Sequence, residues 1–249
     1  MITFISDFGG RDWFVAAVKG EIYRITKDAV IVDITHGIKP HDILSAAFVL
    51  KSVYRNFPKG TVHLVVVDPG VGGDRKPLIV ESEGYYFVGP DNGVFSYIYK
   101  DDSKIYVIEV EEETSVTFHG RDIFAPAAAR LSLGRRPDTF GRKTDGCKKI
   151  PFPVYRRENE RIIGEVVYID HFGNLITNIP NSVKFNRVYC EGKEISVKNF
   201  YEEGEPEEAI CIKGSVGYYE IACNKGSAKD VLGAAVGTWV ICDTVDDAY

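Results

Sequence analysis

Three short runs of apolar, mostly β-branched residues constrain the fold of this chain more than any other feature. The runs are ITFIS (2–6), VIVDI (30–34) and VHLVVVD (62–68), and runs this apolar are typical of parallel strands buried on both faces. Between them, apolar residues recur at helical spacing over residues 12–26 and 42–57. The alternation predicts a βαβαβ unit, and with it a three-layer α/β domain built on a mostly parallel, Rossmann-like sheet.

The loops that follow these three strands hold most of the residues with a potential chemical role. They read SDFGGRD (6–12), DITHGIKPHD (33–42) and VDPGVGGDRKP (67–77). Since ligands of open α/β sheets bind outside the carboxyl ends of the strands, we expect the three loops to share one rim. The second loop ends in Asp42, whose residue type caps helices, so we expect it to begin the helix over residues 42–57.

After residue 156 the pattern changes to short strand-like segments separated by glycine and asparagine. IIGEVVYID, GNLITNI and GYYEIAC are three of them, and repeated strands of this length are typical of small β-barrels and sandwiches. We therefore expect two domains, an α/β domain over residues 1–156 and a small β-barrel domain over residues 157–249.

Composition and charge argue against some classes of partner. The formal net charge is −6 over 249 residues, without a long cluster of lysine and arginine, so we expect no nucleic-acid partner. The chain has no apolar run long enough to cross a bilayer, so we expect no membrane partner. The five cysteines lack CxxC spacing and lie mostly in apolar contexts, which indicates buried thiols and a reducing, cytoplasmic compartment.

The glycines of the third loop do not form a triphosphate-binding motif. DPGVGG (68–73) lacks the lysine and hydroxyl residue that complete a phosphate-binding loop. Glycines also let a backbone approach a ligand closely, which suits a loop that must hold Asp68 and Arg75 in fixed positions. The loop therefore favours a small ligand over a nucleoside triphosphate.

A metal-dependent hydrolase is an alternative, because acids and imidazoles follow the strands. The histidines, however, lack the HxH or HxxxH spacing of metal sites, so we expect no metal. We expect His36, His63 and His171 to be hydrogen-bonded structural groups. The residues that could supply metal ligands are Asp7, Asp33, His36, His41, Asp42, Asp68 and His119.

The segment TFHGRDIFAPAAA (117–129) places an imidazole beside a glycine at the entrance of a predicted helix. One interpretation is structural: Asp122 caps the helix, Pro126 lies in its first turns, and His119 is a loop residue hydrogen-bonded to nearby backbone. The other interpretation is that His119 faces a ligand. This segment alone leaves both open.

Seven segments occur in order along nearly the whole chain: SDFGGRDWFVAAVKG, DITHGIKPHDILSAAFVL, VVVDPGVGGDRK, VGPDNGVFS, TFHGRDIFAPAAA, DHFGNLITNI and GSVGYYEIACNKGSA. In this order they resemble the S-adenosyl-L-methionine hydroxide adenosyltransferases, relatives of the bacterial fluorinase and chlorinase enzymes. The resemblance implies that water or hydroxide displaces L-methionine from C5′ of S-adenosyl-L-methionine. The products would be adenosine and methionine, and no metal or other cofactor would be needed.

In the family that the chain resembles, Asp68, Arg75 and His119 correspond to the residues that activate water. A sulfonium is a good leaving group whose charge disappears as the C–S bond breaks, so it needs no general acid. Catalysis must instead position and activate the nucleophile and exclude bulk water. Asp68 and His119 would contact the water while Arg75 holds the carboxylate, and the division of the proton between Asp68 and His119 stays open.

Gly120 bears on the choice between water and halide. The resemblance implies that Gly120 leaves space where the fluorinating enzyme carries a serine for its halide. The chlorinating relative also has a glycine there, so this residue alone decides nothing. The halogenating relatives lack counterparts of Asp68 and Arg75, which favours hydroxide, with a halogenase as the alternative.

The resemblance also implies residues that bind the sugar and the methionine. Asp7 would grip both ribose hydroxyls, although such a residue could also cap a helix. Asp170 would meet the methionine ammonium with Ser215 beside it. Val216 stands where the fluorinating relative has an arginine, and His41 where it has a tryptophan, which leaves contacts with the methionine carboxylate and with the sugar open.

On the adenine side, the resemblance implies that Phe172 stacks on the base and Asn174 hydrogen bonds with it. Glu220 and the turn over residues 224–227 would complete this side through backbone groups. Each of these residues could instead belong to ordinary turn chemistry.

The resembling proteins are homotrimers, with the site between the α/β domain of one subunit and the β-domain of the next. That would explain why the candidate residues are split between the loops of both domains. The split is also compatible with a cleft inside one monomer. A non-catalytic module that binds adenosine or S-adenosyl-L-methionine is a further alternative. Such a module would not need the set of Asp68, Arg75 and His119.

Overall fold

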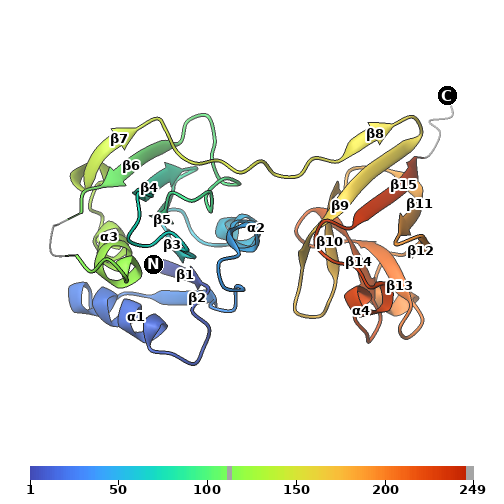
Figure 1. Cartoon of the computed structure of the whole chain (residues 1–249), viewed down its shortest axis with the longest axis horizontal. Coiled ribbons are helices and arrows are strands. Elements are labelled where there is room, and N and C mark those ends of the chain that lie inside the picture. Colours follow the sequence, from blue (N-terminus) through green and yellow to red (C-terminus); the bar gives the residue numbers. More distant parts are fainter. Residues whose placement is uncertain (111–113, 245–249) are drawn as a thin grey trace. The chain divides into compact units, whose positions relative to one another are not determined.

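The computed structural model describes residues 1–110 and 114–244. Contacts within the chain divide it into two compact units, Met1–Phe152 and Pro153–Tyr249 (Figure 1). The sequence pattern placed this division after residue 156. The two units have separate hydrophobic cores.

A seven-stranded sheet of order β2-β1-β3-β5-β4-β6-β7 forms the centre of the first unit. The four strands β2, β1, β3 and β5 run parallel, and β4, β6 and β7 pair antiparallel with their neighbours. The predicted mostly parallel α/β sheet is confirmed for the half that carries the three loops. The strands are β1 (Ile2–Ser6), β2 (Ile31–Thr35), β3 (Val62–Val66), β4 (Pro77–Ser82), β5 (Tyr85–Pro90), β6 (Lys104–Ile108) and β7 (Gly141–Thr144).

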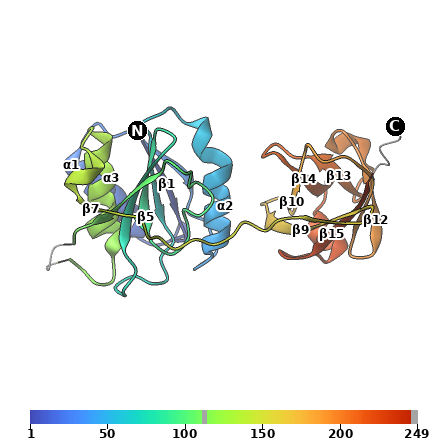
Figure 2. The ribbon, with the colours of Figure 1, turned by 90° about the horizontal axis from the view of Figure 1, so that it is seen from above.

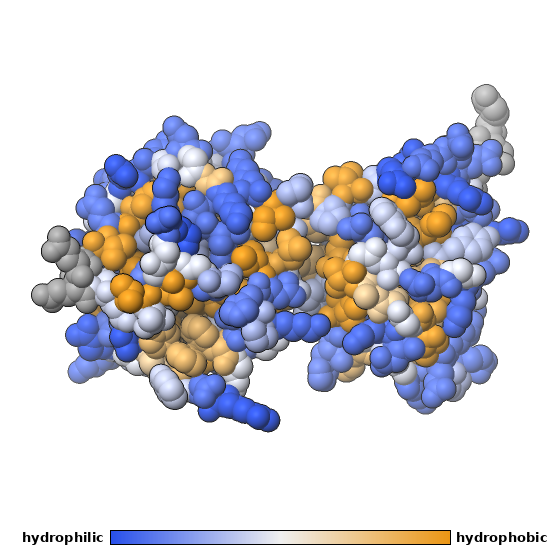
Figure 3. All heavy atoms as spheres, in the orientation of Figure 1, coloured by the Kyte–Doolittle hydropathy of each residue, from blue (hydrophilic) through white to orange (hydrophobic). Residues whose placement is uncertain are grey.

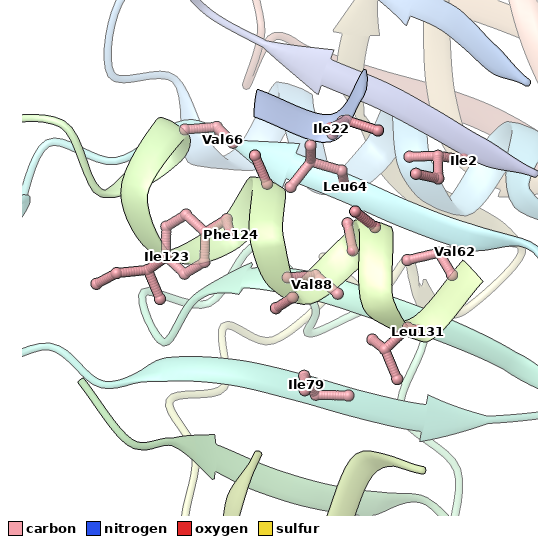
Figure 4. Packing of buried hydrophobic residues seen from close by; sticks show 14 of the residues in the cluster. Ile2, Ile22, Val62, Leu64, Val66, Ile79, Val88, Ile123, Phe124 and Leu131 are labelled. Atoms are coloured by element: carbon pink, nitrogen blue, oxygen red, sulfur yellow. The ribbon is translucent and has the colours of Figure 1, made fainter. Parts of the chain in front are cut away.

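Helices cover both faces of this sheet, as the predicted three-layer domain requires (Figure 2). α1 (Phe14–Ile25) and α3 (Ala125–Ser132) pack on one face, and α2 (Ile43–Val53) packs on the other. Successive side chains of β3 alternate between the two faces. Leu64 and Val66 join the core under α1 and α3 (Figure 4), and Val65 joins the core under α2.

Asp42 caps α2 as predicted. Its Oδ1 atom accepts a hydrogen bond from the Ser45 backbone N–H at 3.0 Å, so one of the unpaired amides of the first turn is satisfied. Short 3₁₀ turns follow α2 at Tyr54–Asn56 and precede β7 at Pro137–Thr139.

The second unit is a closed β-barrel. Seven strands pair in the order β10-β14-β13-β12-β11-β15-β9, and pairing of β9 with β10 closes the ring, while β8 extends from β9. The predicted barrel is therefore confirmed over the sandwich. Its strands are β8 (Arg156–Glu158), β9 (Arg161–Ile169), β10 (Leu175–Pro180), β11 (Phe185–Cys190), β12 (Lys193–Val197), β13 (Ala209–Lys213), β14 (Tyr218–Cys223) and β15 (Trp239–Thr244).

Two short helical elements belong to this unit. A 3₁₀ turn spans Tyr201–Glu203, and α4 spans Ala228–Leu232. Ser227 caps α4 through a hydrogen bond that its hydroxyl accepts from the Asp230 backbone N–H.

All five cysteines are free thiols. Four of them, as predicted, are buried, and they lie in the barrel core, whereas Cys147 is half-buried. Burial raises the pKa of Cys190 to about 11 and that of Cys242 to about 12. These buried thiols therefore stay protonated and unreactive near neutral pH.

Among the described residues, no helix is both long and apolar enough to cross a membrane. On the face drawn in Figure 3, hydrophilic and hydrophobic residues are interspersed over both units.

Candidate active site

Asp68, Arg75 and His119 form a polar cluster at the carboxyl edge of the parallel strands. Asp68 lies two residues beyond β3, and Arg75 lies two residues before β4. His119 occupies the N-cap position of the helical turn that leads into α3, without a capping hydrogen bond from its side chain. Arg75 Nε lies 2.9 Å from Asp68 Oδ1, and Arg75 Nη2 donates both to Asp68 Oδ2 and to His119 Nδ1. The side chains of Arg75 and Asp68 are only 9% and 6% exposed, so this pair is shielded from water.

The proton on His119 can be assigned from this network. A guanidinium has only donors, so His119 Nδ1 must accept, and the imidazole is neutral with its proton on Nε2. Burial lowers the pKa of His119, and the charge of Arg75 lowers it further, against weaker opposing effects of Asp68 and Asp122. The lone pair of His119 is therefore engaged by Arg75, and its Nε2–H remains as a donor.

Two features hold Arg75 in place. Its guanidinium lies over the ring of the buried Phe124, 5.3 Å from the ring centroid, which is a favourable position for a cation. A Cβ atom on Gly70 would lie 3.3 Å from Arg75 Cγ and 3.9 Å from Asp68 Oδ1. The glycine therefore lets the loop close tightly around the ion pair, in agreement with the role expected for the loop glycines.

A cavity of about 260 Å³ opens beside this cluster. All three loops that follow β1, β2 and β3 contribute to it, so they share one rim as predicted. Arg75 is not one of the lining residues, but it contacts two of them, Asp68 and His119. The lining consists of Asp7, Phe8, Phe14, Pro40, His41, Val66, Asp68, Val71, Thr117, Phe118, His119 and Gly120.

An aromatic wall, formed by Phe8, Phe14 and Phe118, makes this cavity largely apolar. The centroid of Phe14 lies 5.4 Å from that of Phe8 and 5.3 Å from that of Phe118. Sequence reasoning missed all three residues, because it assigned Phe14 to a helix face and the other two to loops. Phe8 follows Asp7, Phe118 precedes His119 and Phe14 is the first residue of α1. These positions beside candidate site residues are the sequence signal that could have identified them.

Asp7 is anchored to the loop that follows β2. Its Oδ2 atom accepts a hydrogen bond of 2.9 Å from the His41 backbone N–H, and both residues line the cavity. His41 adopts a φ of 71°, in the left-handed region that residues with a Cβ atom rarely occupy. Such strained positions are often found at binding sites, where the surrounding structure holds them.

Gly120 is buried and enclosed. An added Cβ atom would lie 3.1 Å from Val66 Cγ1, 3.4 Å from Phe118 Cε2 and 3.5 Å from Phe8 Cζ. The space expected at Gly120 is therefore narrow: even a methyl group would press on Val66.

The structural interpretation of residues 117–129 was wrong in two respects. Helical structure begins at Gly120, in a π-helical turn (Gly120–Phe124), so Asp122 lies inside the first turn and does not cap it. The Asp122 carboxylate instead pairs with Arg121. His119 hydrogen bonds with the Arg75 side chain, where that interpretation expected backbone. π-helical turns of this kind are frequent at functional sites.

The residues considered as metal ligands have other partners. Asp33 pairs with Lys19, Asp42 caps α2, and Asp68 pairs with Arg75. Within residues 1–110 and 114–244, no group of three histidine, cysteine or acidic side chains is placed to hold a metal ion.

Two of the three histidines that we expected to be structural groups are hydrogen-bonded as predicted. His36 Nδ1 lies 2.8 Å from Ser6 Oγ, and His63 Nδ1 lies 2.7 Å from Thr3 Oγ1. The ring of His171 packs edge-on against Phe172, with 5.6 Å between the centroids.

The other candidate residues belong to the second unit. Asp170 Oδ1 accepts hydrogen bonds of 2.9 Å from the backbone N–H groups of Phe172 and Asn174, and its Oδ2 accepts one from Asn174 Nδ2. Asp170 thus organises this turn and keeps unused acceptor capacity on Oδ2. Phe172 is 72% exposed, a large aromatic surface with little packing of its own.

Glu220 is buried in β14, and its Oε1 atom accepts a hydrogen bond from the Tyr201 hydroxyl. Burial raises the pKa of Glu220, the Tyr201 hydrogen bond opposes this, and the charge of Asp170 raises it further. Tyr201 was missed by sequence reasoning. Ser215 is exposed in the loop between β13 and β14.

In a comparison with known protein families, both units match domain models of the same family. Residues 2–141 match the model of the SAM hydroxide adenosyltransferase N-terminal domain, and residues 164–241 match that of the C-terminal domain. The chain is 36% identical to an (R)-S-adenosyl-L-methionine hydrolase of Methanocaldococcus jannaschii, with 93% of this chain and 91% of the relative covered. It is 34% identical to a protein of the same name from Thermus thermophilus, with 95% and 96% covered.

More distant relatives and a solved structure extend this comparison. The chain is 26% identical to a fluorinase of Nocardia brasiliensis, with 91% of each chain covered. The crystal structure of an uncharacterized conserved protein from Thermotoga maritima superimposes with a TM-score of 0.88 at 36% identity. It covers 97% of this chain and 99% of that one.

Proposed function

The chain belongs to the SAM hydroxide adenosyltransferase family, and from that premise we propose that its cavity hydrolyses S-adenosyl-L-methionine to adenosine and L-methionine. The observation that carries the proposal is the shielded cluster of Asp68, Arg75 and His119 at the edge of the cavity. A module that only binds a nucleoside has no use for such a buried, charged cluster.

The reaction is a displacement at C5′ of the substrate. A bond forms between the water oxygen and C5′ while the C5′–S bond breaks, and its electron pair neutralises the sulfonium as methionine leaves. The attacking water loses one proton. Since methionine leaves as a neutral thioether, catalysis depends on holding one water in line with the C–S bond and on keeping other water away.

The hydrogen bonds divide the work between Asp68 and His119. Because Arg75 engages the lone pair of His119, the Asp68 carboxylate is the one of these two groups that can still accept a proton from the water. His119 Nε2–H would donate to one lone pair of the water oxygen and leave the other directed at C5′. The aromatic wall would keep bulk water out of the cavity.

The binding roles are supported by the same geometry. Asp7, anchored on one oxygen, would bind the ribose hydroxyls from the rim of the cavity. In the second unit, the spare acceptor of Asp170 suits an ammonium group, and the exposed Ser215 would add a hydroxyl from the loop between β13 and β14. The exposed ring of Phe172 and the amide oxygen of Asn174 suit stacking on and hydrogen bonding with adenine, and the buried Glu220 supports that side.

We further propose a homotrimer in which the first unit of one subunit and the second unit of the next complete each site. The candidate residues are divided between the two units, and a symmetric oligomer is the common way to combine such half-sites. A cytoplasmic location is supported by the five free thiols.

The test is to incubate chelator-treated protein with S-adenosyl-L-methionine in water enriched in ¹⁸O and to follow adenosine and methionine. We expect equimolar release with the label at the 5′ oxygen of adenosine. Asp68→Asn should abolish most of this activity. Asp74→Asn, which changes an exposed acid in the same loop, should not.

Other outcomes would support the alternative functions. Binding of adenosine without any release of products would support the binding module, and loss of activity with chelator would support the metal-dependent hydrolase. Added chloride yielding a chlorinated nucleoside would support the halogenase.

A further inference from the structure

Two small residues, Val66 and Gly120, line the cavity close in sequence to the polar cluster. Both line the cavity together with Asp68 and His119, and both are almost completely buried. Val66 is the last residue of β3, two positions before Asp68. Because side chains two apart on an extended chain point to the same side, Val66 lies beneath the carboxylate that would activate the water.

Val66 and Gly120 are in close contact. A Cβ atom on Gly120 would lie 3.1 Å from Val66 Cγ1, closer than two carbon atoms normally pack. Val66 itself is 3% exposed and belongs to the core under α1 and α3, so it has little freedom to move away (Figure 4). Val66 and Gly120 are therefore fixed parts of the cavity wall that Asp68 and His119 also line.

We propose that Val66 determines which nucleophile can react. We call the part of the cavity next to Asp68 and His119 the chamber: the methyl groups of Val66, together with the Cα atom of Gly120, limit it to one water molecule. This inference rests on the function proposed above. It assigns to a core residue of β3 a role in excluding nucleophiles that are only one carbon larger than water. Such size exclusion by a rigid hydrophobic wall discriminates by about 10- to 200-fold for each methylene.

Competition between water and methanol tests this role. Methanol can be activated by the same carboxylate, and its product, 5′-O-methyladenosine, is separated from adenosine by chromatography. Val66→Ala should raise the ratio of methyl ether to adenosine about 10-fold or more. Val62→Ala is the matched control, because Val62 is a buried valine on the same face of the same strand that does not line the cavity. Its ratio should equal that of the wild type.

The contact between Val66 and Gly120 provides a second test. Gly120→Ala should lower kcat, because the new methyl group enters the chamber, while adenosine binding changes little. In the double variant with Val66→Ala, kcat should rise above that of Gly120→Ala alone, because the space is restored. Additive losses in the double variant would contradict the proposal.

The outcomes separate this inference from the proposed function. A wild-type protein that releases no adenosine would refute the function itself. Normal hydrolysis with the same methanol ratio in Val66→Ala and wild type would refute only the role of Val66. If Val66→Ala does not fold, Val66→Ile adds one methylene at the same place and should lower kcat without weakening adenosine binding. Unchanged kcat in Val66→Ile would equally refute the role.

Discussion

Arg75 determines what its two neighbours can do. Its Nη2 atom donates to Asp68 and to His119 at once, which a lysine ammonium on a flexible chain would not do in the same fixed geometry. The carboxylate is held in one orientation, and the imidazole is held as the neutral form with its proton on Nε2. Of the three side chains in this cluster, only the Asp68 carboxylate is therefore available to accept a proton.

The donor role of His119 predicts unequal effects of two substitutions. In His119→Gln the amide nitrogen can replace Nε2–H as a donor, although glutamine has no basic group. His119→Ala should lower kcat by about 10²- to 10⁴-fold. The kcat of His119→Gln should be at least about ten times higher than the kcat of His119→Ala. Steady-state kcat and KM for S-adenosyl-L-methionine measure both. Equal losses would mean that the basicity of the imidazole is required.

The pH dependence of kcat follows from the same cluster. Burial and the charge of Arg75 lower the pKa of His119, so the neutral form persists below the ordinary histidine value of about 6.5. Protonation would place a hydrogen on Nδ1 against the guanidinium, so activity should be lost on the acid side of that value. We expect kcat to stay level from about pH 8 to 6.5 and to fall only at lower pH. A wild-type decline centred above pH 6.5, absent in His119→Gln, would contradict this.

At the scale of elements, one end of β3 packs in the core and the other lies at the cavity. His63, in its first half, is surrounded by an aromatic box of Tyr54, Phe57, Tyr85 and Phe87. At its other end, Val66 and the following Asp68 line the cavity. The packing of helices on both faces of β3 fixes this end. The aromatic box is thus part of the support of the site.

The buried His63 predicts a loss of stability in acid. Burial lowers its pKa to about 4, whereas the unfolded chain has a value of about 6.5. The unfolded state therefore binds more protons between these values, and the stability present above pH 6.5 is lost as the pH falls toward 4. The difference corresponds to about 3 kcal/mol. Urea unfolding at pH 7 and pH 5 should show a smaller pH dependence for His63→Gln than for the wild type. Equal pH dependence would show that His63 is not the group responsible.

At the scale of the whole molecule, the candidate residues lie on two units that fold around separate cores. Asp7, Asp68 and His119 belong to the α/β unit, and Asp170 and Phe172 to the barrel. If each site needs both units, activity depends on how subunits combine as well as on the residues themselves.

Mixing inactive variants tests the proposed homotrimer. Asp68→Asn affects the first unit, and Asp170→Ala affects the second. Co-refolding them in equal amounts should restore about a quarter of the wild-type activity, because each site draws its halves from different subunits. Light scattering should give three times the 27.8 kDa mass of one chain. No recovery from a mixed trimer would mean that both halves come from the same chain.

Local patterns in the sequence were sufficient for much of this fold. The strands, the helices and the Asp42 cap follow from side-chain periodicity and from capping chemistry, which act over a few residues. The shared rim follows from the rule that parallel strands end at one edge. The order of motifs was sufficient to identify the family and to select Asp68, Arg75 and His119 as candidates.

Only the tertiary structure decided the state of the site. Arg75 and His119 are 44 residues apart, and no local pattern says that the guanidinium engages the histidine lone pair, that Asp122 does not cap its helix, or that Val66 closes on Gly120. These contacts depend on how the π-helical turn packs against the end of β3. Contact distances between residues far apart in the chain are set to within a few tenths of an ångström by the packing of the whole core, because each side chain there is held by many neighbours at once.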